Sequence, residues 1–341
     1  MNKKLKTTLI VALSLFGAGI IICFCVAMSA NFDFTKLSAN FQSESVNASN
    51  AKTEHIEKSI EASGQNISLN IGSADIRLEK SVDENIHISY TNTEDNYFKL
   101  ESSKSEIVLT QHQNSGHFFF MFGFFGSSDS ASGEVVVSIP IENKGGLDID
   151  VASGDVTASD IELSGDFVID TASGDVSLEN SKIGRFSTSS ASGEVRLSEV
   201  ETENIDIDTA SGEVSLSKIA GNIPVTLDTI SGEVYIEDVE TKELRIGTVS
   251  GDITLSKVSG QTVGFSTTSA GVELNGADFK EISFVTVSGD IHGTVSGSSD
   301  DYTVYAETIS GSNNLSSHKG RGQRTLDLSS TSGSFDISFE K

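Results

Sequence analysis

The residues best placed to do chemistry are acids that recur at one position of a repeated motif. Ser-Gly-Asp/Glu followed by Val or Ile returns about every 19 to 20 residues along much of the chain. Its acids include, in order, Asp155, Asp175, Glu194, Glu213, Glu233 and Asp252. Calcium prefers oxygen ligands, so a calcium-binding row is one hypothesis for closely spaced carboxylates of this kind. The Gly-Gly-x-Gly-x-Asp calcium repeat is absent, and the alternative is a solvated acidic edge that opposes sideways aggregation.

Short strands are the elements that must position these acids. A fixed period in this range is typical of a solenoid, whose repeats bury their apolar faces against one another. Apolar residues alternate around each motif, as at Phe167 and Ile169 before one copy and Val176 and Leu178 after it. Alternation directs these side chains inward, so that equivalent acids stack about 4.8 Å apart. We expect an all-β, single-stack β-solenoid (β-helix), preceded by one N-terminal transmembrane helix.

The turn itself has a recurrent composition. Glycine permits a positive φ, and a small residue such as Ala172 before Ser-Gly suits a crowded corner. Later copies carry Ile230, Val249 and Val287 at this position. The sequence therefore predicts that the corner widens toward the C-terminus.

The N-terminal segment predicts a membrane attachment. Three lysines among the first six residues precede an apolar run from Leu9 to Met28, which is long enough to span a bilayer. We expect residues 1–30 to form a retained anchor, with a cleaved signal peptide as the alternative. The protein would be a single-pass cell-membrane protein whose C-terminal domain is extracytoplasmic. Cys23 and Cys25 lie in this run, so the rest of the chain has no disulfide or cysteine metal site.

Composition divides the remainder. Residues 31–58 are polar and predict a stalk, residues 59–131 predict an N-terminal cap with the first rungs, and residues 132–341 predict the regular solenoid with a C-terminal cap. The net charge is −26. Nucleic acid is excluded as a partner, because its phosphates require a cationic surface.

An apolar insertion interrupts the cap at residues 117–126. It holds six phenylalanines: Phe118, Phe119, Phe120, Phe122, Phe124 and Phe125. Exposed apolar patches commonly mark interfaces, so this segment predicts a loop that enters a membrane or binds a partner. The alternative is a loop folded over the end of the solenoid, or a surface for self-association.

Catalysis finds little support. The sequence has no Gly-x-Ser-x-Gly elbow, no Walker-type loop and no His-x-x-x-His pair. A glycan-acting β-helix enzyme would need a loop that breaks the repeat, and the nearest candidates are Arg321 and Arg324 in the segment that begins at His318. The alternative for that segment is a basic surface loop. We expect a protein that is not an enzyme and has no cofactor, with calcium on the acidic row as the alternative.

The Ser-Gly-Asp/Glu-Val rungs behind one membrane segment resemble the bacterial "putative adhesin" family of unknown function. That family includes LiaG-like membrane-anchored proteins of Gram-positive envelope-stress loci. The resemblance covers roughly residues 60–341 and supplies no catalytic residues. It implies an adhesin-like or envelope-stress accessory binding module, with a cell-wall polymer or a membrane protein as partner. The alternative is a scaffold that binds membrane proteins through the Phe-rich insertion.

Overall fold

A computed structural model describes residues 53–113, 133–141 and 143–340. The predicted anchor, residues 31–52 of the predicted stalk and the six phenylalanines of the insertion lie outside the described residues. Within the described ranges, no helix is long and apolar enough to cross a membrane. The first strand begins at Glu54, within the segment that the sequence assigned to the stalk.

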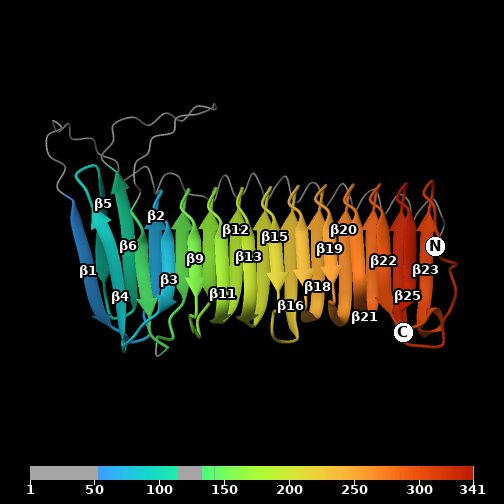
Figure 1. Ribbon diagram of the computed structural model, residues 1–341, viewed down its shortest axis with the longest axis horizontal. Helices are drawn as coiled ribbons and strands as arrows, with labels where there is room; N and C mark the ends of the chain where they lie inside the picture. Colours follow the sequence, from blue (N-terminus) through green and yellow to red (C-terminus); the bar gives the residue numbers. More distant parts are fainter. Residues whose placement is uncertain (1–52, 114–132, 142, 341) are drawn as a thin grey trace.

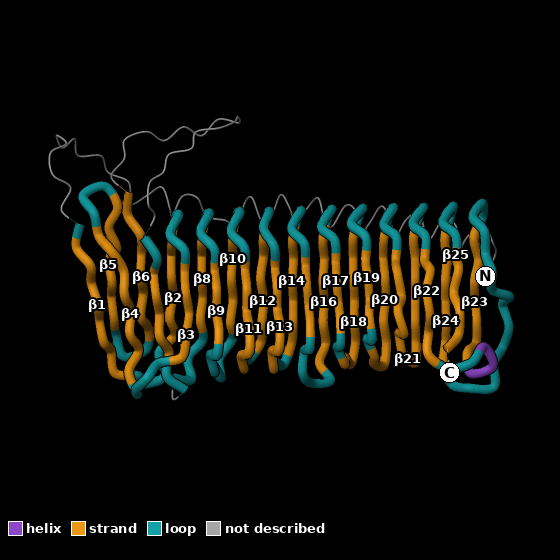
Figure 2. The backbone as a smooth tube through the Cα atoms, in the orientation of Figure 1, coloured by secondary structure: helices purple, strands orange, loops and turns teal. Residues whose placement is uncertain are grey.

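The described chain forms an elongated rod of two facing sheets (Figures 1 and 2). We call the sheet that contains the strand before each Ser-Gly turn the leading sheet, and the other the trailing sheet. The leading sheet has the order β5 (Asn96–Ser102), β6 (Glu106–Gln113), β2 (Asn66–Ile71), β8 (Leu147–Val151), β10 (Phe167–Thr171), β12 (Arg185–Ser190), β14 (Asn204–Thr209), β16 (Ile223–Thr229), β18 (Glu240–Thr248), β20 (Ser259–Thr267), the second half of β21 (Val272–Thr286), β24 (Arg324–Ser330) and β23 (Tyr302–Thr308). The trailing sheet has the order β1 (Glu54–Glu61), β4 (Asn85–Asn92), β7 (Val135–Ile139), β3 (Ile76–Lys80), β9 (Val156–Ser159), β11 (Val176–Lys182), β13 (Val195–Glu201), β15 (Val214–Ser217), β17 (Val234–Glu237), β19 (Ile253–Ser256), the first half of β21, β22 (Ile291–Ser296) and β25 (Phe335–Glu340). Besides these strands, the described residues hold one short 3₁₀ turn, η1 (Ser299–Asp301).

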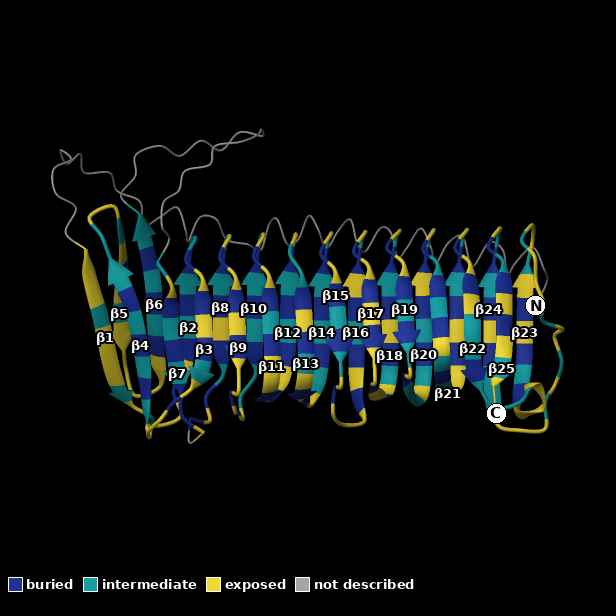
Figure 3. Ribbon diagram, viewed as in Figure 1, coloured by how far each residue is buried: buried dark blue, intermediate teal, exposed yellow. Residues whose placement is uncertain are grey.

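The parallel register stacks equivalent residues of successive rungs. Val176 lies opposite Val195, and Val195 lies opposite Val214 in the next rung, so the three valines form one column. Such columns are fully buried between the sheets, and buried and exposed residues alternate along each strand (Figure 3). Larger side chains stack in the same way, as Phe167 does edge-on against Phe186 with ring centroids 5.8 Å apart. The predicted all-β solenoid is confirmed for the described residues.

Close stacking of the backbone explains the turn glycines. A Cβ atom on Gly212 would overlap the carbonyl oxygen of Gly193 in the preceding turn, and the same holds at Gly174, Gly232 and Gly251. Among the turn glycines of the described rungs, only Gly193 has a positive φ, of 141°. The expectation that these turns need a positive φ is therefore wrong for most of them.

The residue before each Ser-Gly pair does not lie in a crowded corner. Ala172 is half-buried and points away from the core, as do the larger Ile230, Val249 and Val287 at the same position. Because these side chains reach solvent, a larger one needs no wider turn. The predicted widening of the corner is wrong.

At the N-terminal end, the rungs are not stacked in chain order. β2 lies between β6 and β8, and β3 lies between β7 and β9. The rung that contains β6 and β7 is thus the outermost of the parallel rungs, although it comes later in the chain than the rung that contains β2 and β3. Beyond it, β4 and then β1 extend the trailing sheet, and β5 extends the leading sheet, all by antiparallel pairing.

The C-terminal end shows the same inversion. β24 lies between β21 and β23, so that Gly333 stacks on Gly289 and Gly311 stacks on Gly333. The chain then covers its own sheet edges. The N–H of Phe335 donates to the carbonyl of Ser312 at 2.8 Å, and Val304 of β23 exchanges two backbone hydrogen bonds with His318. The described end of the rod is closed by residues 312–320.

Candidate binding surfaces

The six predicted acids form one row along the edge of the rod where the Ser-Gly turns lie (Figure 2), which we call the rim row. The aspartates of this row accept hydrogen bonds from backbone N–H groups of the next turn. The N–H of Asp175 donates to Oδ1 of Asp155 at 2.9 Å, and the N–H of Glu194 donates to Oδ1 of Asp175 at 2.7 Å. The N–H of Gly271 donates to Oδ1 of Asp252 at 2.8 Å. Each rim aspartate thus links its turn to the next one, in addition to the stacked strands.

The glutamates of the rim row make different contacts. The longer side chain carries the carboxylate away from the next turn, toward solvent and neighbouring side chains. Glu194 accepts a hydrogen bond from Arg196, and Glu233 accepts one from the hydroxyl of Tyr235. The rim row is therefore uniform in charge but not in structure.

In the described part of the chain, no three side chains of histidine, aspartate or glutamate converge in the way a metal ion requires. Calcium on the rim row stays a prediction. The structure shows a row of carboxylates one rung apart, most of them exposed.

The Phe-rich insertion leaves and re-enters the rod at its N-terminal end. β6 ends at Gln113, and the described chain resumes at Gly133, which lies beside Thr91 of β4. Thr91 pairs with His55 at the start of β1. The segment before β1 and the insertion therefore join the rod at the same corner, at the left of Figure 1.

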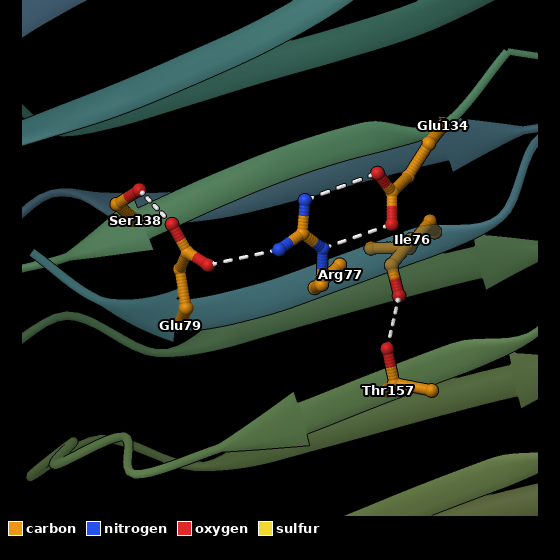
Figure 4. Close-up of polar contacts among 6 residues, drawn as sticks. All are labelled: Ile76, Arg77, Glu79, Glu134, Ser138 and Thr157. Atoms are coloured by element: carbon orange, nitrogen blue, oxygen red, sulfur yellow. Dashed lines mark hydrogen bonds and ion pairs between the residues drawn. The ribbon is translucent and has the colours of Figure 1, made fainter.

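An arginine fixes the point where the insertion returns (Figure 4). Arg77 of β3 donates from Nε and Nη2 to the two carboxylate oxygens of Glu134, at 2.9 and 3.1 Å, and from Nη1 to Glu79 at 3.2 Å. Ser138 of β7 donates to the other oxygen of Glu79 at 3.1 Å. This paired geometry holds the residue before β7 against the rung that contains β3.

The predicted basic loop is part of the C-terminal closure. Arg324 binds Oδ1 of Asp278 at 2.6 Å and also donates to the carbonyl of Ser296 and the hydroxyl of Tyr302. Arg321 donates its backbone N–H to the carbonyl of Asp300. These contacts hold the C-terminal closure together within the described chain.

His318 has an unusual setting in this closure. Its Nδ1 lies 2.8 Å from the carbonyl oxygen of Ser316, and its Nε2 lies 3.0 Å from the carbonyl oxygen of Ser299. A neutral imidazole has one N–H, so only the imidazolium can donate to both carbonyls. These two hydrogen bonds raise the pKa of His318.

Sequence reasoning missed a second acidic row, on the outer face of the leading sheet, which we call the face row. It consists of Asp150, Asp170, Asp208 and Asp228, with Ser189 between Asp170 and Asp208. The signal was present, because the rungs of Asp170 and Asp208 read Asp-Thr-Ala-Ser-Gly and that of Asp228 reads Asp-Thr-Ile-Ser-Gly. Alternation placed these residues outward but did not distinguish them from other polar positions.

Burial and mutual repulsion affect the protonation of the face row. Burial among neighbouring strands, with the charges of Asp228 and Asp206, raises the pKa of Asp208 to about 7. Burial also raises the pKa of Asp170, against a hydrogen bond from Ser189, and burial with the charge of Asp206 raises the pKa of Asp228. Since Asp228 is exposed and Asp208 is half-buried, we expect the effect to be strongest at Asp208.

Comparison with known proteins identifies the family. The sequence matches the Toastrack DUF4097 family over residues 64–226 and again over residues 224–341. A crystal structure of a "putative cell adhesion protein" from Clostridium sporogenes ATCC 15579 shares 12% identity, and the similarity covers 85% of this chain and 100% of that chain with a TM-score of 0.21. No curated protein matches. Because the family matches span most of the chain, including most of the described rod, this protein belongs to the Toastrack DUF4097 family.

Proposed function

We propose that this protein acts by binding, as a non-enzymatic adhesin-like module of the bacterial cell envelope. The observation that carries the proposal is the repetition of one polar surface along the rod, which suits a polymer of repeating units. Asp155, Asp175 and Glu194 follow one another at a strand spacing of about 4.8 Å along the rim. The ligand we propose is a cell-wall polymer, whose repeating units would match this spacing. Calcium would bridge the anionic groups of the polymer to the rim.

The proposal includes a place in the cell. The apolar run from Leu9 to Met28 would anchor the protein as a single-pass membrane protein, with the rod outside the cell. The envelope-stress role of LiaG-like proteins is the accessory function that this arrangement would serve. The N-terminal corner would then be the attached end of the rod, and the closed C-terminal end would be distal.

Co-sedimentation with cell-wall sacculi tests this proposal. Full-length protein is mixed with purified sacculi in calcium and in chelator, beside a variant in which Asp155→Asn and Asp175→Asn are combined. Calcium-dependent pelleting that the variant loses supports a metal-bridged rim. Pelleting in both conditions keeps the adhesin and removes the metal, and no pelleting in either contradicts wall binding. Release of soluble glycan fragments would instead favour the enzyme that the β-helix architecture also allows.

A second candidate function is a scaffold for membrane proteins, and one observation favours it. The Phe-rich insertion and the segment before β1 join the rod at one corner, where Gly133 lies beside Thr91. An anchor and a Phe-rich segment that start from one corner would both reach the same bilayer or the same membrane-embedded partner. The acidic rod itself would be repelled by anionic lipid.

Removal of residues 118–125 separates the two functions. The deletion spares Gln113 and Gly133, so the flanking strands should be unaffected. A wall-binding rod should keep its sedimentation with sacculi, whereas a scaffold should lose the membrane proteins that cross-link to it in cells. A matched control replaces the six phenylalanines with serine at unchanged length. Unchanged cross-linking in both variants would contradict the scaffold.

A further inference from the structure

The middle of the face row places two carboxylates directly opposite each other. Asp208 of β14 pairs in register with Asp228 of β16, and Asp206 lies two residues before Asp208 on the same face. Strands of one sheet are about 4.8 Å apart, and like charges directly opposite one another destabilise the pairing. Two ionised groups at this position therefore oppose the stacking of the rungs that carry them.

No cation compensates this pair among the neighbouring described residues of that face. β12 presents Ser187 and Ser189 beside β14, and β16 presents Thr226 beside Asp206. The remaining candidate is Arg245 of β18, which lies opposite Thr226 and is held by Glu243 at 2.6 Å. It is a diagonal neighbour of Asp228 on the adjacent strand, but its charge is already paired with that of Glu243, and the pKa of Asp228 is raised.

The carboxylate of Asp228 lies against the next strand of the sheet, at a glycine. Gly247 follows it in the row, and a Cβ atom on Gly247 would overlap Oδ1 of Asp228. The carboxylate therefore lies over the glycine backbone of β18. On the rim, by contrast, the carboxylate of Asp175 accepts a hydrogen bond from the backbone N–H of Glu194.

We propose that Asp208 and Asp228 together take up one proton as the medium becomes mildly acidic, and that this uptake stabilises the central rungs of the rod. The proton comes from the solvent and removes one of two opposed charges. The resulting carboxylic acid gains an O–H donor, while the other carboxylate stays an acceptor. The two groups then titrate as a coupled pair, because each ionisation raises the cost of the next.

The direction of the effect follows from linkage. Burial, followed by the charges of Asp228 and Asp206, raises the pKa of Asp208 to about 7, against an ordinary aspartate value of 3.8. Between these values the folded protein binds more protons than the unfolded chain. The stabilisation is therefore fully present below about 3.8 and is lost as the pH rises through about 7.

The pair would also make the charge of one broad face of the rod depend on pH. At neutral pH and above, this face would repel anionic polymers more strongly than in mild acid. The inference does not depend on the proposed envelope function, because the proton uptake follows from the described strands alone.

Thermal unfolding of the full-length protein between pH 5.5 and pH 8 tests the proposal, with Asp208→Asn as the variant and Asp175→Asn as the matched rim control. The wild-type midpoint should rise by about 2 °C or more as the pH falls, and Asp208→Asn should lose much of that rise. Asp175→Asn should keep it. His318 titrates in all three proteins, so its contribution cancels when the profiles are compared.

A direct titration removes any dependence on the variants. Carbon-13 NMR of the aspartate carboxyl groups, assigned through Asp208→Asn, should show a midpoint for Asp208 above 6 in the wild-type protein. A midpoint near 4, or parallel unfolding profiles for the wild type and Asp208→Asn, would overturn the proposal.

Discussion

The aspartates of the rim row and those of the face row recur at the same period, yet they act in opposite ways. Asp175 on the rim accepts the N–H of Glu194 at 2.7 Å and thereby links two turns. Asp208 on the face lies opposite Asp228, with Asp206 beside it and no cation paired with it among the described residues. One row helps to hold the stack together, and the other opposes it until a proton is bound.

The difference shows that position relative to the turn determines what a repeated acid does. At the rim, the backbone leaves the strand ladder and turns, so that an N–H of the next rung is free for a side chain. Within a strand, the backbone N–H groups already bind the neighbouring strand, and only other side chains remain as partners. A repeated aspartate is therefore stabilising at the rim position and destabilising five residues earlier, within the strand.

The largest expected effect concerns the glycines that bring the rim turns together. Gly212→Ala would place a Cβ atom on the carbonyl oxygen of Gly193, so we expect a loss of about 3 kcal/mol in the free energy of unfolding. Gly264→Ala is the matched control, because Gly264 lies on the leading sheet and has no atom within 4 Å of that position. Chemical denaturation measures both, and equal losses would contradict the close stacking of the turns.

The next effect concerns the rung that interrupts the face row. β12 carries Ser189 in place of aspartate, and the buried hydroxyls of Thr188 and Ser190 have no hydrogen-bond partner in the described structure. Thr188→Val keeps the shape and removes one unsatisfied group, so the protein should gain about 1 kcal/mol in the free energy of unfolding. Thr209→Val is the control, because its hydroxyl accepts the N–H of Gly212 and its removal should destabilise. A loss of stability in Thr188→Val would indicate a partner for this hydroxyl in solution.

A smaller effect tests whether His318 titrates independently of the face row. The hydrogen bonds to Ser316 and Ser299 raise the pKa of His318 above its ordinary 6.5. The stabilisation is fully present below 6.5 and is lost as the pH rises through the higher folded-state pKa. Hydrogen exchange at the N–H of Val304, corrected for the intrinsic rate, should therefore slow in mild acid. His318→Ala should abolish that change and leave exchange in β14 unaltered, and a matching change in β14 would show that the two sites are not separate.

Much of the fold could be predicted from the sequence because the repeat is local. The alternation at Val176 and Leu178 gave the inward positions, and the period gave the stacking of the rungs. The inverted order at both ends was missed because it depends on contacts between distant segments, such as Ile67 with Leu147. No pattern within a single rung indicates which rung will be its neighbour.

The candidate sites were predicted less well, for a related reason. The rim acids were placed correctly in one row, but the N–H that each aspartate accepts belongs to the next rung, and its availability depends on turn geometry. The role of Gly212 was missed in the same way, because the obstructing carbonyl belongs to Gly193 of the preceding rung. The raised pKa of Asp208 requires the register that places it opposite Asp228, which no single repeat contains.

The most direct test of this account compares Asp175→Asn with Asp208→Asn in full-length protein at pH 8. Asn removes a charge at nearly constant size in both cases, so only the surroundings differ. We expect Asp175→Asn to lower the free energy of unfolding by about 0.5 kcal/mol, because it weakens a charge-assisted hydrogen bond. We expect Asp208→Asn to raise it by about 0.5 kcal/mol, because it removes like-charge repulsion. Opposite signs would support the two roles, whereas a loss of stability in both variants would contradict them.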